Sequence, residues 1–315
     1  MRATPFVVGK PHVLRVFAAL ICAASACASA AAPPTQDSAR FSADFAYRPC
    51  DGLICMDVSI DGGAPRTLML DTGNAHSTLL TDVAQPLGWE LKPVQRDGKD
   101  VAGIYRAGEH RVRLGAIEGR EDFFVFDRAL LGEHRPPVDG SIAYDFFKDR
   151  VLEIDFERHR LRISDVVTTP VPDRAADTGT LKLITFGEHG PPIVVGAPFT
   201  LDGKPLHAQI DTVFTGTLLV YDRAVEALDQ HKQGKSEFFG YTDGGVNLLA
   251  TTARSIGFGD ATIAKKPTVY FVGEGDNPVH QPDGLFEATV GNALFAHSIL
   301  TMDFHAGTVA VRPAR

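Results

Sequence analysis

Several common active-site motifs are missing from this sequence of 315 residues, which contains only one tryptophan and four cysteines. It has no Gly-x-Ser-x-Gly elbow of the α/β hydrolases and no His-Glu-x-x-His pair of the zinc peptidases. Gly234-Lys235-Ser236 lacks the earlier glycine of a phosphate-binding loop, and Gly257-Phe258-Gly259 lacks the rest of a dinucleotide fingerprint. These absences favour a site that uses no metal, nucleotide or other cofactor.

Positive charge is scarce as well. The chain has 31 lysines and arginines against 39 aspartates and glutamates, which gives a formal net charge of −8. Three of the cations lie within residues 1–31, so the remaining chain carries about −11. This balance argues against nucleic acids and anionic membranes as partners, because both are bound by basic surfaces.

Long hydrophobic runs are confined to the start of the chain. Residues 1–31 begin with three cations, continue with the apolar stretch Val16–Ala24 and end in small residues, which is typical of a secretory signal peptide. The stretch is too short for a membrane span, and none is expected later in the chain. Cys27 lacks the large aliphatic residue that precedes a lipoprotein cysteine. We expect cleavage near Ala30 or Ala31 and a periplasmic or secreted protein without a lipid.

Only two cysteines, Cys50 and Cys55, remain once the leader is removed. They flank Asp51-Gly52, a dipeptide that favours a tight turn between two strands. Export places them in an oxidising compartment, where disulfides form and persist. The sequence therefore predicts a small disulfide across the mouth of a hairpin, with two unpaired thiols as the alternative.

One pattern occurs twice in the chain. Leu68–Gly73 is an apolar run that ends in Asp71-Thr72-Gly73, and a second apolar run follows it. Ala208–Val213 repeats this arrangement with Asp211-Thr212-Val213, again before an apolar run. Two acids at the same point of two similar units suggest one site shared between two halves.

The similarity between the halves extends well beyond the two acids. Upstream, Val58–Gly63 and Phe199–Lys204 each have the pattern of a strand broken by an Asp-Gly turn. Downstream, Ile142–Phe147 and Val290–Phe295 stand at matching positions before another strand-like run. A repeat of this length predicts two homologous lobes.

These paired motifs resemble the aspartic peptidase family. The turn that begins at Asp211, with the sequence Asp-Thr-Val-Phe-Thr-Gly, is similar to the retropepsin-like variants of bacteria, here in a fused two-lobe chain. The resemblance covers almost all of the chain after the leader. It implies an all-β, bilobal fold of the pepsin or retropepsin type, with two β-barrel-like lobes and a cleft between them.

Composition and turn residues divide the chain into five expected parts. Residues 1–31 are the signal peptide, and residues 32–40 are a polar, flexible tail. Short strands with Gly, Pro and Asp turns fill the N-terminal lobe, 41–164, and the C-terminal lobe, 181–315. The polar, proline-bearing stretch 165–180 is the expected linker.

The resemblance also implies the residues of the site. Asp71 and Asp211 correspond to the catalytic dyad, in which one carboxylate activates water and the other acts as an acid, without a cofactor. Thr72 and Thr212 match the threonines that lock the two turns together, and Gly73 keeps the family's glycine. Tyr105 stands where the family carries a flap over the substrate; an ordinary tyrosine on an edge strand is the alternative.

The second turn departs from the family at Val213, where a glycine is expected. A branched side chain disfavours positive φ and close backbone approach, so Val213 is expected to disturb the second half-site. The leading interpretation is an exported, monomeric aspartic-type endopeptidase that takes a peptide or protein substrate as an added strand. The alternative is a non-catalytic peptide-binding or regulatory relative.

Overall fold

The computed structural model describes residues 43–96, 98–131, 137–164, 178–185, 192–231, 233–239, 246–272 and 286–314. The expected signal peptide and tail, and all but the last three residues of the expected linker, lie outside these ranges and stay predictions. Within them the chain is mostly β-strand, so the all-β expectation is confirmed. The expected linker overlaps a strand, because β12 (Thr178–Thr185) begins before residue 181.

The first sheet is built from the first half of the chain, in the order β2-β3-β4-β9-β5-β8-β7-β6. Its strands are β2 (Arg48–Cys50), β3 (Leu53–Ile60), β4 (Arg66–Asp71), β5 (Thr78–Leu80), β6 (Lys92–Arg96), β7 (Lys99–Leu114), β8 (Ile117–Phe126) and β9 (Gly140–Ala143). Strands β4 and β9 run parallel and place Asp71 opposite Ala143. The first acid therefore stands at the end of a strand inside the sheet.

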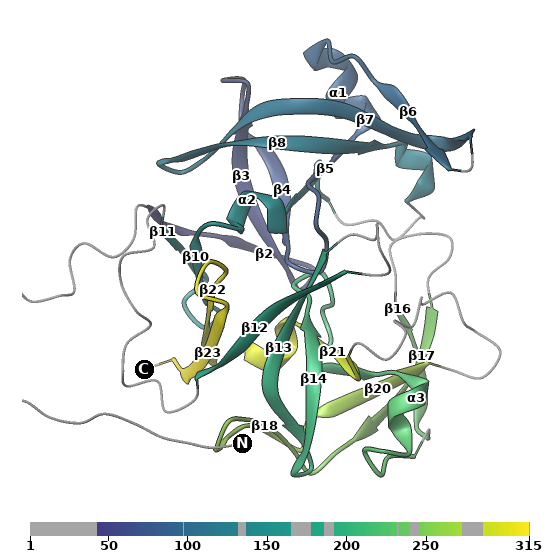
Figure 1. The fold of residues 1–315 in the computed structure, drawn as a ribbon, viewed down its shortest axis with the longest axis vertical. Coiled ribbons are helices and arrows are strands. Elements are labelled where there is room, and N and C mark those ends of the chain that lie inside the picture. The colour runs from purple at the N-terminus through teal and green to yellow at the C-terminus, as the bar shows by residue number, and fades with distance from the viewer. Residues whose placement is uncertain are drawn as a thin grey trace, which may run out of the picture. The chain divides into compact units, whose positions relative to one another are not determined.

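The second sheet joins strands from both halves in the order β1-β11-β10-β22-β23-β12-β13-β14-β21-β15-β20-β17-β16, with β18 and β19 attached beside β13. Besides β12, its strands are β1 (Ala43–Ala46), β10 (Val151–Asp155), β11 (Arg160–Ser164), β13 (Pro192–Leu201), β14 (Lys204–Ile210), β15 (Leu218–Val220), β16 (Lys235–Phe239), β17 (Val246–Thr252), β18 (Ser255–Phe258), β19 (Ala261–Lys265), β20 (Thr268–Val272), β21 (Ala288–Val290), β22 (Ser298–Asp303) and β23 (Thr308–Pro313). Strands β10 and β22 pair antiparallel and link the two halves (Figure 1).

Asp-Gly turns close the hairpins that the sequence predicts. Asp51-Gly52 joins β2 to β3 and Asp202-Gly203 joins β13 to β14, each with positive φ at both residues. Two positive φ angles match the twist of antiparallel strands, which is why this dipeptide favours hairpins. Asp61-Gly62 has the same backbone conformation in the wider connection between β3 and β4. The hairpin before each Asp-Thr pair is confirmed.

Helical segments are short: α1 (Thr81–Ala84), η1 (Gln85–Leu87), η2 (Arg128–Leu130), α2 (Tyr144–Phe147), α3 (Asp222–Val225) and η3 (Asn292–Phe295). The pattern of Tyr221–Leu228 predicts a longer helix than α3. The N–H of Leu228 still donates to the carbonyl of Ala224 at 2.9 Å, so helical bonding continues past α3. The N–H of Gln230 then donates to the carbonyl five residues before it, at Val225, just after Asp229 with positive φ, which is how helices commonly end. Among the described residues, no helix is long and apolar enough to cross a membrane.

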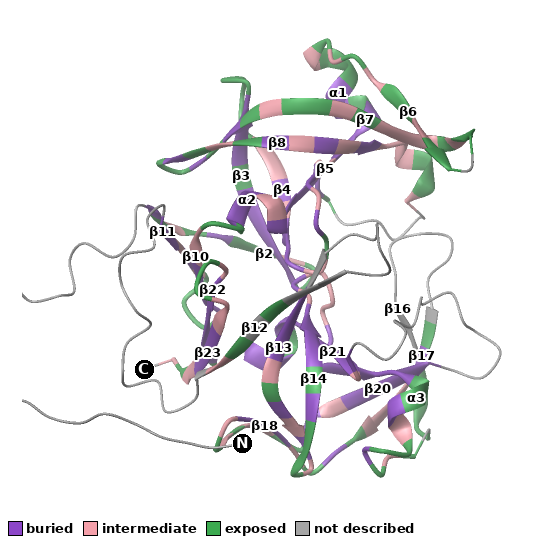
Figure 2. Ribbon diagram, viewed as in Figure 1, coloured by how far each residue is buried: buried purple, intermediate pink, exposed green. Residues whose placement is uncertain are grey.

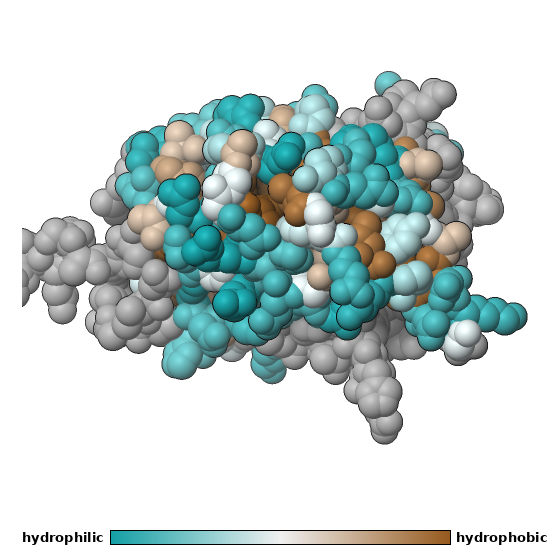
Figure 3. All heavy atoms as spheres, turned by 90° about the horizontal axis from the view of Figure 1, so that it is seen from above, coloured by the Kyte–Doolittle hydropathy of each residue, from teal (hydrophilic) through white to brown (hydrophobic). Residues whose placement is uncertain are grey.

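Apolar side chains fill the core and drive each Asp-Thr turn inward. Strand β3 is buried at every residue except one, and the last three residues of β14 are all buried (Figure 2). Strand β7, next to the edge strand β6 of the first sheet, is mostly exposed or part-buried and is fully buried only at Val112 and Leu114. Figure 3 shows the face seen from above as mainly hydrophilic, with a few separate hydrophobic spots. The strands that lead to the two acids, β4 and β14, are therefore most buried at the ends where the acids stand.

Candidate active site

The two acids occupy equivalent positions in two copies of one local structure. Asp71 ends β4 beside the parallel strand β9, and Asp211 directly follows β14 beside the parallel strand β21. The N–H of Asp211 donates to the carbonyl of Val290 at 3.0 Å. Just beyond these strands, the N–H of Tyr144 donates to Asn74 at 3.1 Å, and that of Asn292 donates to Phe214 at 2.9 Å. The internal repeat thus folds in the same way twice.

A reciprocal set of buried hydrogen bonds joins the two turns. The Thr72 hydroxyl donates to the carbonyl of Ile210 at 2.8 Å, and the Thr212 hydroxyl donates to that of Leu70 at 2.7 Å. Each threonine N–H donates to the other's hydroxyl oxygen, at 3.1 Å for Thr72 and 3.2 Å for Thr212. Because these groups are buried, water does not compete for their hydrogen bonds. The bonds therefore hold the two turns in a fixed position relative to each other.

The same junction brings the two carboxyl groups together. A Cβ atom placed on Gly73 would lie 2.3 Å from the Asp211 carboxyl carbon, so the carboxyl of the second turn rests on the backbone of the first. Gly73 has no positive φ and is required by this close approach alone. Any other residue would push the Asp211 carboxyl away from the first turn.

Burial and mutual repulsion set the protonation of the pair. Asp71 is only 8% exposed, and burial first, then the charge of Asp211, raises its pKa. The N–H groups of Gly73 and Asn74 partly oppose that shift. Burial also raises the pKa of Asp211, against the N–H groups of Val213 and Phe214. Burial therefore favours the protonated form of both acids, and the charge of Asp211 adds to this effect at Asp71.

The expected strain at Val213 is wrong. Its φ lies outside the left-handed region, and its N–H donates to Oδ1 of Asp211 at 2.8 Å. The side chain packs against an apolar cluster that includes Leu53 and Cys55 of β3. The turn therefore needs no glycine at this position, since the branched side chain packs against residues of the first half of the chain.

The sequence alone did not predict the polar contacts of Gln209 at the site. The amide of Gln209 donates to the carbonyl of Gly73 at 3.0 Å, and its oxygen accepts a bond from the Thr289 hydroxyl at 3.2 Å. That hydroxyl lies 2.8 Å from the hydroxyl oxygen of Tyr221. The available signal was a polar residue in an inward-facing run, at the position where the first half has Met69.

Tyr105 lies in the body of the first sheet. It stands on β7 opposite Pro93 and Val125, and it packs against the main core. The hairpin of β6 and β7 turns farther along, between Arg96 and Lys99. No contact described in these strands joins Tyr105 to either acid, and a role in substrate binding stays a prediction.

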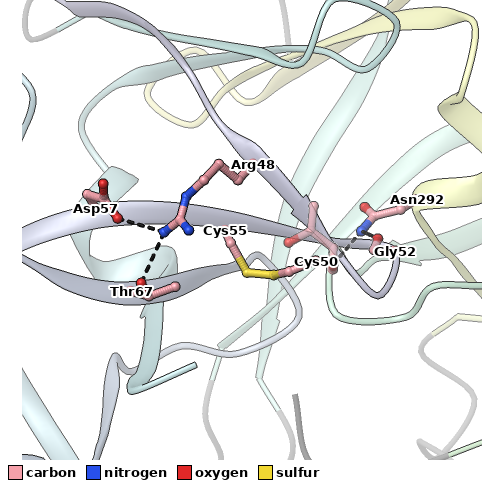
Figure 4. Close-up of a disulfide and its surroundings, with 8 residues drawn as sticks. Arg48, Cys50, Gly52, Cys55, Asp57, Thr67 and Asn292 are labelled. Atoms are coloured by element: carbon pink, nitrogen blue, oxygen red, sulfur yellow. Dashed lines mark hydrogen bonds and ion pairs between the residues drawn. A yellow bond between two sulfur atoms is a disulfide. The ribbon is translucent and has the colours of Figure 1, made fainter. Parts of the chain in front are cut away.

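The predicted disulfide is confirmed. Cys50 on β2 and Cys55 on β3 are joined, with 6.1 Å between their Cα atoms (Figure 4). The bond closes the Asp51-Gly52 hairpin, which lies close to the second acid's turn. In the part of the chain that the structure describes, no group of three or more His, Cys, Asp or Glu side chains is placed to hold a metal ion.

Comparison with known proteins assigns the chain to no family. No protein-family model matches the chain, and no curated protein matches it in sequence. Among solved structures, the crystal structure of basic 7S globulin from soybean matches with 10% identity over 86% of this chain and 94% of that chain, at a TM-score of 0.44. A likeness of this strength supports no statement about activity.

Proposed function

We propose that this chain is an exported aspartic-type endopeptidase with a bilobal, pepsin- or retropepsin-like fold. The proposed lobes are 41–164 and 181–315, and each contributes one acid. The observation that carries the proposal is the junction of Asp71 and Asp211 over the reciprocal bonds of Thr72 and Thr212. A scaffold has no need for two buried carboxyl groups that repel each other, because unpaired buried charge is costly.

The chemistry follows from a pair that holds one proton. The ionised carboxylate takes a proton from a water molecule, whose oxygen attacks the scissile carbonyl carbon. The protonated carboxyl donates a hydrogen bond to the carbonyl oxygen and stabilises the developing charge. The tetrahedral intermediate then breaks its C–N bond. The carboxyl that took the proton from water gives it to the leaving amine, and the proton of the intermediate's hydroxyl returns to the other carboxylate, so the pair again holds one proton. The threonine hydrogen bonds hold the two turns together, and with them the carboxyl groups of Asp71 and Asp211. Little reorganisation of these groups is therefore needed during the reaction.

The competing hypothesis, a non-catalytic peptide-binding relative, was based on Val213. Its side chain packs against the cluster that includes Leu53 and its N–H bonds Asp211, which supports the endopeptidase over this alternative. No other observation at the described site favours the competing hypothesis.

Cleavage of an unfolded protein by the purified chain from about pH 3 to 8 tests the proposal. We expect cleavage by the wild type, inhibition by pepstatin, and loss of at least about 10³-fold in rate for Asp71→Asn and for Asp211→Asn. Circular dichroism should show that both variants stay folded. A folded wild type that cleaves at no pH would contradict the endopeptidase and favour the binding relative.

A further inference from the structure

A single side chain links the second turn to the disulfide-closed hairpin. The amide nitrogen of Asn292 donates to the carbonyl of Thr212 at 2.7 Å and to the carbonyl of Gly52 at 2.9 Å. Thr212 directly follows Asp211, and Gly52 lies at the tip of the hairpin (Figure 4). The position of the second acid is thus connected to a segment about 160 residues earlier in the chain.

Two packing contacts strengthen this connection. A Cβ atom on Gly52 would lie 3.1 Å from two carbons of Thr215, so the hairpin tip rests directly on the turn. Gly52 also has φ of +82°, which favours glycine there. Val213 packs against the apolar cluster that includes Leu53 and Cys55 of β3. The second turn is therefore in contact with Asn292 and with the hairpin that the disulfide closes.

Asn292 occupies its position at an energetic cost. It is only 7% exposed, and its Oδ1 atom is buried without a hydrogen-bond partner among the described residues. A buried unpaired acceptor is destabilising, whereas an apolar side chain would avoid the penalty. The two hydrogen bonds from its amide nitrogen must offset this cost. Their function is to hold the hairpin and the turn together.

The equivalent position of the first half has no such contact. Tyr144 corresponds to Asn292, since both donate a backbone N–H to the turn of their own half. The ring of Tyr144, however, packs edge-on against Phe304. The side-chain link to a hairpin is described only at the second acid.

We propose that Asn292 is a positioning residue for Asp211 and that it acts through the hairpin closed by Cys50–Cys55, so that hydrolysis depends on the oxidation state of this disulfide. The inference rests on the proposed function. A dithiol would break the Sγ–Sγ bond, give two thiols and become a cyclic disulfide, passing two electrons and two protons to the protein. A cavity of about 260 Å³ borders Gly52, Thr215 and Asn292, so the released hairpin has room to shift.

The first test compares kcat and KM for a fluorogenic peptide among three variants and the wild type with and without dithiothreitol. Asn292→Ala removes both hydrogen bonds, and Asn292→Asp places a carboxylate against two carbonyl oxygens with almost no change of shape. We expect kcat to fall about 10- to 100-fold, more for the aspartate, with KM changed less than about threefold. The double variant Cys50→Ser, Cys55→Ser should show the same loss of kcat. The wild type in dithiothreitol should show it too, and it alone should recover when the disulfide is reoxidised.

Arg48→Ala is the matched control on the same hairpin. Its exposed guanidinium bonds Asp57 and Thr67, away from the turn, at 2.8 and 3.0 Å (Figure 4). We expect its kcat to stay within about twofold of the wild type. Unchanged kcat in the folded asparagine and cysteine variants would overturn the proposal, as would an equal loss in Arg48→Ala.

A second measurement needs no activity. The carboxyl carbons of Asp71 and Asp211 can be titrated by NMR in the full chain, before and after reduction and in Asn292→Asp. We expect the shared titration to move by at least about half a pH unit, because a shifted turn changes the distance between the carboxyl groups. If the wild type does not cleave but the titration moves, only the endopeptidase is wrong. A titration that stays fixed in both cases rejects the positioning role.

Discussion

The turn after Asp71 and the turn after Asp211 contact each other through the same atoms of Thr72 and Thr212, yet their outer contacts differ. The first turn receives the Asp211 carboxyl on Gly73 and a hydrogen bond from Gln209. The second turn is supported by apolar packing and by an asparagine. The shared contacts are those that fix the two acids relative to each other, and the surrounding contacts have diverged.

This difference explains why only one of the two turns needs a glycine. At Gly73 the space for a side chain is filled by a carboxyl group. At Val213 the side chain points toward the apolar cluster around Leu53 and Cys55. Residues at equivalent positions of two repeats can therefore have different neighbours and so need side chains of different size.

Exchanging the two residues should produce the largest effect. In Gly73→Val, a Cβ atom 2.3 Å from the Asp211 carboxyl carbon must displace that acid, so we expect kcat to fall by at least about 10³-fold. In Val213→Gly we expect kcat within about tenfold of the wild type and a lower free energy of unfolding by about 1–3 kcal/mol, from lost packing. Peptide cleavage and urea unfolding measure the two effects. An active Gly73→Val enzyme would contradict the carboxyl contact.

The next largest effect is expected at Glu121, a buried acid that supports only the first turn. The Ser77 hydroxyl donates to Glu121 at 2.5 Å and accepts the N–H of Ala143, the residue opposite Asp71, at 3.1 Å. Its counterpart, Thr217, donates to the backbone carbonyl of Thr268. Glu121 is 2% exposed, and burial raises its pKa from 4.5 to about 7, with the Ser77 bond opposing the shift.

The raised pKa of Glu121 makes the stability of the folded state depend on pH. The folded state holds the proton of Glu121 more tightly than the unfolded state, so the contribution is complete below about pH 4.5 and is lost as pH rises through about 7. We expect the stability of the wild type relative to Glu121→Gln to fall by up to about 3 kcal/mol between pH 4.5 and 8. Urea unfolding at several pH values measures it. A constant difference between the two proteins would show that Glu121 does not titrate in this range.

The sequence predicted the repeated part of this structure because repetition leaves a visible pattern. Apolar runs before Asp71 and Asp211 and Asp-Gly pairs at the hairpins have local causes, namely burial of strand residues and positive φ. The disulfide followed from spacing and an expected turn. Each of these features depends on residues close together in the chain.

The contacts that distinguish the halves could not be predicted, since they join residues far apart. Nothing near Gln209 or Asn292 indicates that its amide binds a carbonyl more than 130 residues away. Val213 was expected to be harmful because the apolar cluster that accepts its side chain belongs to another segment. The roles of these residues depend on contacts with distant segments of the chain and not on the local sequence pattern.

Gln209→Met offers the finest test of the comparison, because it gives the second half the residue that the first half has at Met69. The change keeps the length of the side chain and removes only the amide's bonds to Gly73 and Thr289. We expect the free energy of unfolding to fall by about 1 kcal/mol and kcat to fall by less than about tenfold, since the threonine bonds still hold both turns. The matched control is Met69→Leu, which alters no polar contact. If Gln209→Met unfolded the chain or abolished cleavage, the threonine pair alone would not hold the turns, and the outer contacts would have to count as part of the junction itself.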